Sequence, residues 1–203
     1  MKHQALWAGI LGAAVLTMGQ AAVAAGDPEA GKAKFYTCQG CHSIPGYTNA
    51  YPTYHVPKIG GQYEPYLISA LQAYKEGARK HGSMQGNAGS LSDQDMADLA
   101  AYAAKFENNK QEGPVTGDPD AGKALAQKCT SCHGEDGNAP APNFPRLAGQ
   151  YESYLIKAIQ DYQTGKRNNA LMQSMVQGLS EADVHNLAAF YASQAGLGIV
   201  ERD

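Results

Sequence analysis

The sequence predicts an all-α protein made of two tandem copies of one small domain. Apolar and aromatic residues recur at helical spacing in several segments, and no alternating run indicates a strand. Residues 27–33 reappear with one change as residues 118–124, and a Cys-x-x-Cys-His motif follows in both places. Recurrence of one specific segment together with its motif is typical of an internal duplication.

The duplication covers most of the chain and sets the expected domain limits. Residues 27–33 match residues 118–124 at an interval of 91, whereas Gly61–Glu64 match Gly149–Glu152 at an interval of 88. The first copy therefore has three extra residues between these segments. We predict a first domain at 26–106, a polar linker with Gly and Pro at 107–117, and a second domain at 118–203.

Three helices are expected in each copy. The first begins at an Asp that caps it, followed by Pro, and runs into the cysteine motif. The second carries aromatic and aliphatic residues along one face. The third begins at a Ser-x-x-Asp sequence that resembles a capping box. In the two copies these features are Asp27 and Asp118, residues 66–74 and 154–162, and Ser92 and Ser180.

All four cysteines lie in the motifs Cys38–His42 and Cys129–His133. Cys-x-x-Cys-His is the attachment pattern of c-type haem. Residues three apart share a helix face, so both thiols can bond the two vinyl groups of one porphyrin, and the His can bind its iron. We expect two covalently attached haem c groups, held by Cys38, Cys41, Cys129 and Cys132, with His42 and His133 as axial iron ligands.

Disulfides and a zinc site are the two alternatives to haem for these cysteines. An even number of cysteines in an exported chain is typical of disulfides, but disulfides do not require a His after each pair. Zinc ribbons space their cysteine pairs by roughly 15 to 20 residues. Here the pairs begin 91 residues apart, which favours haem.

Methionine is the expected second axial ligand. Met84 and Met172 occupy equivalent positions of the repeat, in segments rich in Gly, Ser, Asn and Gln that precede the last helix. Met175 aligns with Asn87 and is the weaker candidate. Filling of the core is the commoner use of Met, and we expect it for Met96. Met84 and Met172 are therefore predicted to complete the two iron sites.

Three histidines outside the motifs are weaker ligand candidates. His81 lies close to Met84 in sequence, but its counterpart is Asn169. His185 is expected on a helix surface. His55 follows the aromatic segment 47–54 of the first copy, where it could bond a haem propionate, shield a haem edge or be an ordinary loop residue.

Residues 1–25 resemble an export signal. Lys2 supplies the positive start, residues 6–18 a short apolar run, and Ala22–Ala24 an A-x-A cleavage site. The apolar run is shorter than the roughly 20 residues that span a bilayer, so we expect cleavage near Ala24 or Ala25 and no transmembrane span. The mature chain is expected to be soluble and to lie in an oxidising compartment, where haem is attached to thiols.

Charge argues against a nucleic-acid partner. The net charge is −3, removal of Lys2 makes it more negative, and haem propionates would add further negative charge. A protein redox partner that offers a basic or apolar docking patch is expected instead.

With both motifs, two distal Met residues and two G-Q-Y-x-x-Y-L segments, the chain resembles the dihaem cytochrome c4 family. The resemblance implies tandem class I cytochrome c domains packed about a pseudo-twofold axis. It also implies that a Pro carbonyl orients the proximal His, which for the second copy would fall on Pro140 or Pro142. Residues 43–56 of the first copy depart from the family pattern.

The resemblance further implies a periplasmic electron-transfer protein of a respiratory chain, either free or loosely attached to the membrane surface. Its donor would be a cytochrome bc complex or a dehydrogenase, and its acceptor a terminal oxidase. Two alternatives are the cytochrome subunit of a flavocytochrome-type dehydrogenase and a dihaem enzyme that acts on thiosulfate or peroxide. An enzyme needs an open iron position. Met in both copies therefore favours a carrier that is not an enzyme.

Overall fold

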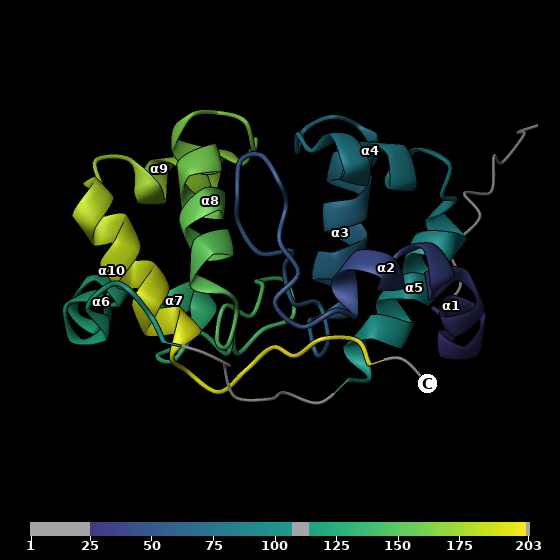
Figure 1. The fold of residues 1–203 in the computed structure, drawn as a ribbon, viewed down its shortest axis with the longest axis horizontal. Coiled ribbons are helices and arrows are strands. Elements are labelled where there is room, and N and C mark those ends of the chain that lie inside the picture. Colours follow the sequence, from purple (N-terminus) through teal and green to yellow (C-terminus); the bar gives the residue numbers. More distant parts are fainter. Residues whose placement is uncertain (1–24, 107–113, 202–203) are drawn as a thin grey trace, which may run out of the picture.

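The computed structural model describes residues 25–106 and 114–201, and their helices form two lobes that lie side by side (Figure 1). The predicted leader, apart from its last residue, and residues 107–113 of the predicted linker lie outside the described residues. Within the described residues the secondary structure is helical, and only isolated bridges are extended. The all-α prediction is confirmed.

Both lobes have the same order of helices. The first contains α1 (Pro28–Lys34), a 3-10 turn (Phe35–Thr37), α2 (Gln39–His42), α3 (Glu64–Lys75), α4 (Gly82–Gly89) and α5 (Asp93–Ala104). The second contains α6 (Pro119–Ala126), α7 (Thr130–His133), α8 (Glu152–Gln163), α9 (Ala170–Val176) and α10 (Glu181–Ala192).

The first and last helices of each lobe cross at a glycine. α1 packs against α5, and α6 against α10. A Cβ added at Gly31 would lie 2.0 Å from the carbonyl oxygen of Asp98, and one added at Gly122 would lie 2.0 Å from that of Asn186. Because no side chain fits there, glycine permits the close helix crossing that holds each motif against its domain core.

The helix starts agree with the sequence patterns, but the first helix does not run unbroken into the motif. Asp27 and Asp118 cap their helices, and both Ser-x-x-Asp capping boxes form. α1 ends at Lys34, and a 3-10 turn follows in which the N–H of Cys38 donates to the carbonyl of Phe35. Phe35 is buried against the ring of Tyr102, and the motif then begins a separate helical turn.

The chain after α10 leaves the second lobe and reaches the first (Figure 1). Gly198 exchanges backbone hydrogen bonds of 2.9 and 3.0 Å with Gly60. Val200 is completely buried and belongs to the core of the first domain, in one cluster with Phe35 and Leu67. The first domain therefore takes a core residue from the far end of the chain.

The interface between the lobes has approximate twofold symmetry. The buried amide of Gln62 accepts from the backbone N–H of Arg146 and donates to its carbonyl, both at 3.0 Å. The buried amide of Gln150 makes the same two bonds with Lys58, at 2.9 and 2.8 Å. Both pairs obey the interval of 88. The duplicated sequence thus generates a duplicated interface.

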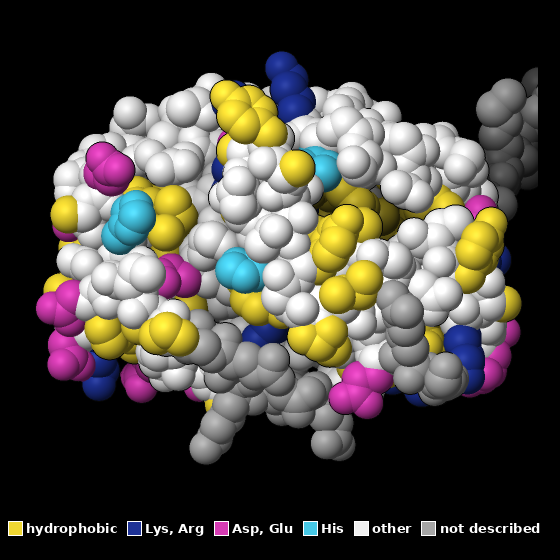
Figure 2. Space-filling view, in the orientation of Figure 1, with side chains coloured by type: hydrophobic (Ala, Val, Ile, Leu, Met, Phe, Trp, Pro, Cys, Tyr) yellow, Lys and Arg dark blue, Asp and Glu magenta, His cyan; other side chains and the backbone are white. Residues whose placement is uncertain are grey.

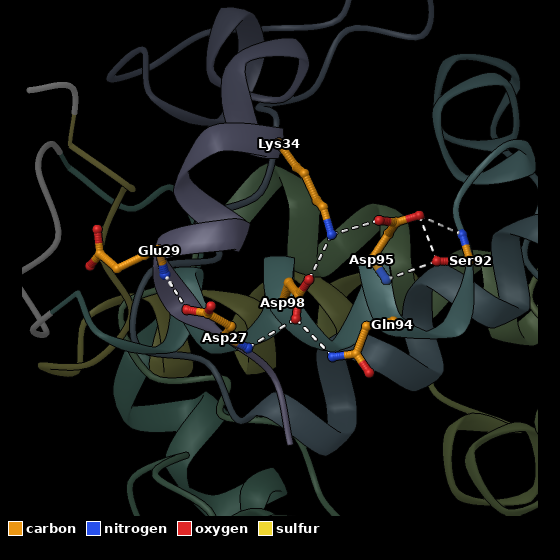
Figure 3. Close-up of polar contacts among 7 residues, drawn as sticks. All are labelled: Asp27, Glu29, Lys34, Ser92, Gln94, Asp95 and Asp98. Carbon is orange, nitrogen blue, oxygen red and sulfur yellow. Dashed lines mark hydrogen bonds and ion pairs between the residues drawn. The ribbon is translucent and has the colours of Figure 1, made fainter. Parts of the chain in front are cut away.

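An ionic cluster joins α1 to α5 in the first domain (Figure 3). Lys34 Nζ lies 2.7 Å from a carboxylate oxygen of Asp95 and 2.6 Å from one of Asp98. Asp98 is buried and also accepts from the backbone N–H of Asp27 and the side chain of Gln94. These bonds lower the pKa of Asp98, and the bond from Lys34 contributes most. In the second domain the positions of Lys34 and Asp98 hold uncharged residues, Leu125 and Asn186.

Replacing Asp98 with asparagine is therefore expected to destabilise the first domain at neutral pH but not in acid. A carboxylate whose native pKa is lowered stabilises the fold above its unfolded pKa of about 3.9, and this contribution is lost as the pH falls through the native pKa. Urea unfolding between pH 7 and pH 3 should show the wild type and D98N converging in acid.

The matched control is Glu29→Gln, since Glu29 forms an ion pair of 3.5 Å with Lys105 in which both side chains are largely exposed. Exposed pairs contribute little to stability, so E29Q should follow the wild type at every pH. A difference between wild type and D98N that does not change with pH would contradict the role assigned to Asp98.

Candidate haem-binding sites

Each cysteine motif forms one helical turn at the edge of its domain core. Cys38 and Cys129 are half-buried and pack against the two core clusters. Cys41 is exposed, Cys132 is half-buried, and all four thiols are free. The described residues contain no group of three or more His, Cys, Asp or Glu side chains placed to hold a metal ion.

The histidine of each motif is oriented by a proline carbonyl. His42 Nδ1 lies 2.9 Å from the carbonyl oxygen of Pro57, and His133 Nδ1 lies 3.0 Å from that of Pro145. Donation by Nδ1–H to the carbonyl fixes the tautomer and leaves Nε2 as the nitrogen for iron. Burial lowers the pKa of both histidines, which favours the neutral ring that binds a metal.

The expectation that the carbonyl of Pro140 or Pro142 orients His133 is wrong, because the carbonyl that accepts from its Nδ1–H is that of Pro145. The interval of 88 pairs Pro145 with Pro57, so comparison of the two copies could have identified it.

Met84 and Met172 lie on the short helices α4 and α9, which are not among the three helices expected in each copy. Both helices are capped three residues before the methionine. His81 Nδ1 accepts from the N–H of Met84 at 3.3 Å, and Asn169 Oδ1 accepts from that of Met172 at 3.0 Å. His81 thus has the same structural role as its counterpart Asn169. Met84 and Met172 are half-buried, whereas Met175 is 42% exposed.

The other candidate residues, Met96, His55 and His185, lie in the core, at the domain interface and on a helix, respectively. Met96 is fully buried in α5, as expected for core packing. His55 bonds the hydroxyl of Ser153 at 2.8 Å and stacks on Tyr151 at 4.6 Å, so the divergent loop of the first copy contacts the second domain. His185 is half-buried on α10.

The donors and the shape of the first site fit a haem. α2 contains Cys41 and His42 and directly follows Cys38, and it lies across the face of the first lobe from α4, which carries Met84 (Figure 1). Figure 2 shows that this face is hollowed there and that hydrophobic side chains line the hollow. Two thiols, an imidazole with a free Nε2, a thioether and an apolar hollow are the groups that haem c requires.

This fold and its pair of sites define a two-domain c-type cytochrome. The cytochrome c family model matches residues 28–105 and again residues 119–194. Cytochrome c4 of Pseudomonas aeruginosa is 35% identical over 87% of this chain and 94% of its own. The crystal structure of cytochrome c4 from Pseudomonas stutzeri is 31% identical, with a TM-score of 0.70, over 84% of this chain and 100% of that one.

The chain therefore belongs to the dihaem cytochrome c4 family. It carries two covalently attached haem c groups and acts as an electron-transfer protein rather than an enzyme. A protein of Thiomonas intermedia named as a thiosulfate dehydrogenase electron acceptor is also similar, at 30% identity over 84% of this chain and 82% of its own. Within 25–106 and 114–201, no helix is long and apolar enough to cross a membrane.

Proposed function

We propose that this cytochrome is a periplasmic electron carrier whose two irons are each closed by one His and one Met. The observation that carries the proposal is the equivalence of the two sites: both combine a motif turn, a carbonyl-oriented His and a half-buried Met on a capped helix. Export follows from the leader 1–25, with cleavage near Ala24 or Ala25. The proposed domain limits are 26–106 and 118–203, with the linker 107–117.

The proposed haem contacts follow the repeat. In the first domain Cys38 and Cys41 hold the porphyrin, and His42 and Met84 bind its iron. In the second domain the corresponding residues are Cys129, Cys132, His133 and Met172. Bound haem supplies an iron that alternates between the ferrous and ferric states. The imidazole and the thioether are both neutral, and hydrogen-bonded helical segments hold both. These ligands therefore need little rearrangement when the charge of the iron changes.

A dehydrogenase is the better-supported electron donor. Two relatives are named as electron acceptors of thiosulfate dehydrogenase. The thiosulfate dehydrogenase TsdBA of Marichromatium purpuratum contains a region similar to this chain, with a TM-score of 0.72 over 82% of this chain and 40% of that one. Donation by a cytochrome bc complex and delivery to a terminal oxidase remain part of the proposal, as does loose membrane attachment.

Stopped-flow reduction of the purified cytochrome tests the choice of donor. Reduction by thiosulfate dehydrogenase with thiosulfate should be fast and should change with ionic strength, because the carrier is negatively charged. The cytochrome alone should not oxidise thiosulfate. Turnover of thiosulfate without the dehydrogenase would contradict the carrier function, and fast reduction by a cytochrome bc complex only would exclude this dehydrogenase as donor.

A further inference from the structure

Two arginines meet at the centre of the domain interface. Arg79 lies between α3 and α4, and Arg167 lies between α8 and α9, so they are equivalent in the repeat. Their backbones form an antiparallel bridge, in which the N–H of Asn168 donates to the carbonyl of Ala78 at 2.8 Å. Two cationic side chains are thereby brought together where the two lobes join.

Aromatic residues surround both guanidinium groups in a crossed arrangement. Arg79 donates from Nη2 to the hydroxyl of Tyr154, which belongs to the second domain. Arg167 donates from Nη2 to the hydroxyl of Tyr66, which belongs to the first, at 2.8 Å. Each guanidinium also lies 4.5 Å from the ring centre of a buried tyrosine of its own domain, Tyr74 or Tyr162.

Among the described residues neither arginine has an anionic partner. Neither forms an ion pair with a carboxylate there, although Arg79 is only 8% exposed. The pKa of Tyr66 is lowered to about 8, although burial alone would raise it. At pH 7 this phenol is therefore still mostly neutral and does not supply the missing negative charge. Burial of a cation without a counter-charge is costly, so an anion is expected at this site.

The arginines lie close to the haem sites. Arg79 precedes Met84 by five residues, and Arg167 precedes Met172 by five. Met84 and Met172 are the proposed iron ligands, so each arginine immediately precedes the short helix that carries one of them. A haem has two propionate carboxylates, which are the kind of anion that a guanidinium pairs with.

We propose that Arg79 and Arg167 form a paired anion site for haem propionates, and that each arginine is positioned by a tyrosine hydroxyl of the opposite domain. The guanidinium of arginine can donate two parallel hydrogen bonds to one carboxylate, which the ammonium group of lysine cannot do. The site would keep a propionate ionised inside the interface and would tie the potential of each haem to the contact between the domains. The inference rests on the proposed haem placement.

The test is Arg79→Gln in the haem-loaded protein, with Arg79→Lys beside it. A unit charge at roughly 10 Å changes the reduction equilibrium by about tenfold, which for one electron is about 59 mV. R79Q should lower the potential of the first-domain haem by about this amount, because loss of the cation favours ferric iron. It should also shift the propionate bending mode in resonance Raman spectra. R79K should retain most of the potential but show the Raman shift.

Tyr63→Phe is the matched control, since Tyr63 donates across the interface to the carbonyl of Ala139 without contacting either arginine. It should change neither readout. An unchanged potential and propionate mode in R79Q would overturn the proposal. So would a wild-type potential that changes when chloride replaces phosphate at constant ionic strength, because the anion would then come from solution. Haem content and the near-infrared Met band should also be measured for each variant. If both are normal, the proposed iron ligands are in place, and the result bears on the arginine site alone.

Discussion

Replacing Met172 with alanine is expected to abolish the near-infrared thioether-to-iron band of one haem and to lower that haem's reduction potential. Met172 is half-buried on a helix capped by Asn169, at the position equivalent to Met84. A soft, neutral thioether stabilises ferrous iron more than water does. The fall should be on the order of 0.1 V, within the roughly 0.8 V over which axial ligands set haem potentials. Spectroelectrochemical titration with magnetic circular dichroism measures both effects.

Met175 provides the control for this prediction, since it lies on the same helix and is 42% exposed. Alanine at position 175 should leave the band and both potentials unchanged. Loss of the band in M175A and its persistence in M172A would identify Met175 as the ligand and contradict the equivalence of Met84 and Met172.

Replacing Val200 with alanine is expected to destabilise the first domain by about 2 kcal/mol, although the residue follows α10, the last helix of the second domain. Val200 is completely buried in the cluster that contains Phe35, Leu67 and Leu99. Removing two buried methyl groups loses their transfer free energy and leaves a cavity. Thermal unfolding of the first domain should occur about 10 °C lower.

Amide hydrogen exchange locates this effect. Protection should fall in α1 and α5 of V200A, with α6 and α10 as the internal reference. Glu201→Ala is the matched control, because Glu201 is the exposed neighbour of Val200 and should change neither lobe. Equal loss of protection in both lobes would contradict the assignment of Val200 to the first core.

The duplication made several features of this fold predictable. Helix caps such as Asp27 and Ser92 act within a few residues, so a short sequence pattern is enough to identify them. The motif Cys38–His42 and its second copy are likewise recognisable from a short pattern, because their functional residues lie within five positions. Comparison of the copies also selected Met172 over Met175, a choice that agrees with the exposure of Met175.

Other features depend on contacts between segments distant in the chain. The hydrogen bonds between Gln62 and Arg146 join residues that no local pattern connects. The same is true of the packing of Val200 in the core of the first domain. Pro145 is predictable from the repeat, because it occupies the position equivalent to Pro57, whereas family resemblance alone points to other prolines. His81 is a ligand candidate in the sequence because it lies close to Met84, but in the structure it caps α4, a role that depends on backbone geometry.

An electron carrier of the proposed kind requires that both irons are closed by protein ligands. Addition of carbon monoxide to the fully reduced protein at neutral pH, followed by its Soret spectrum, tests this claim most directly. Because carbon monoxide must first displace Met84 or Met172, we expect slow, substoichiometric binding at both haems. Rapid binding of one carbon monoxide per haem at either site would contradict it.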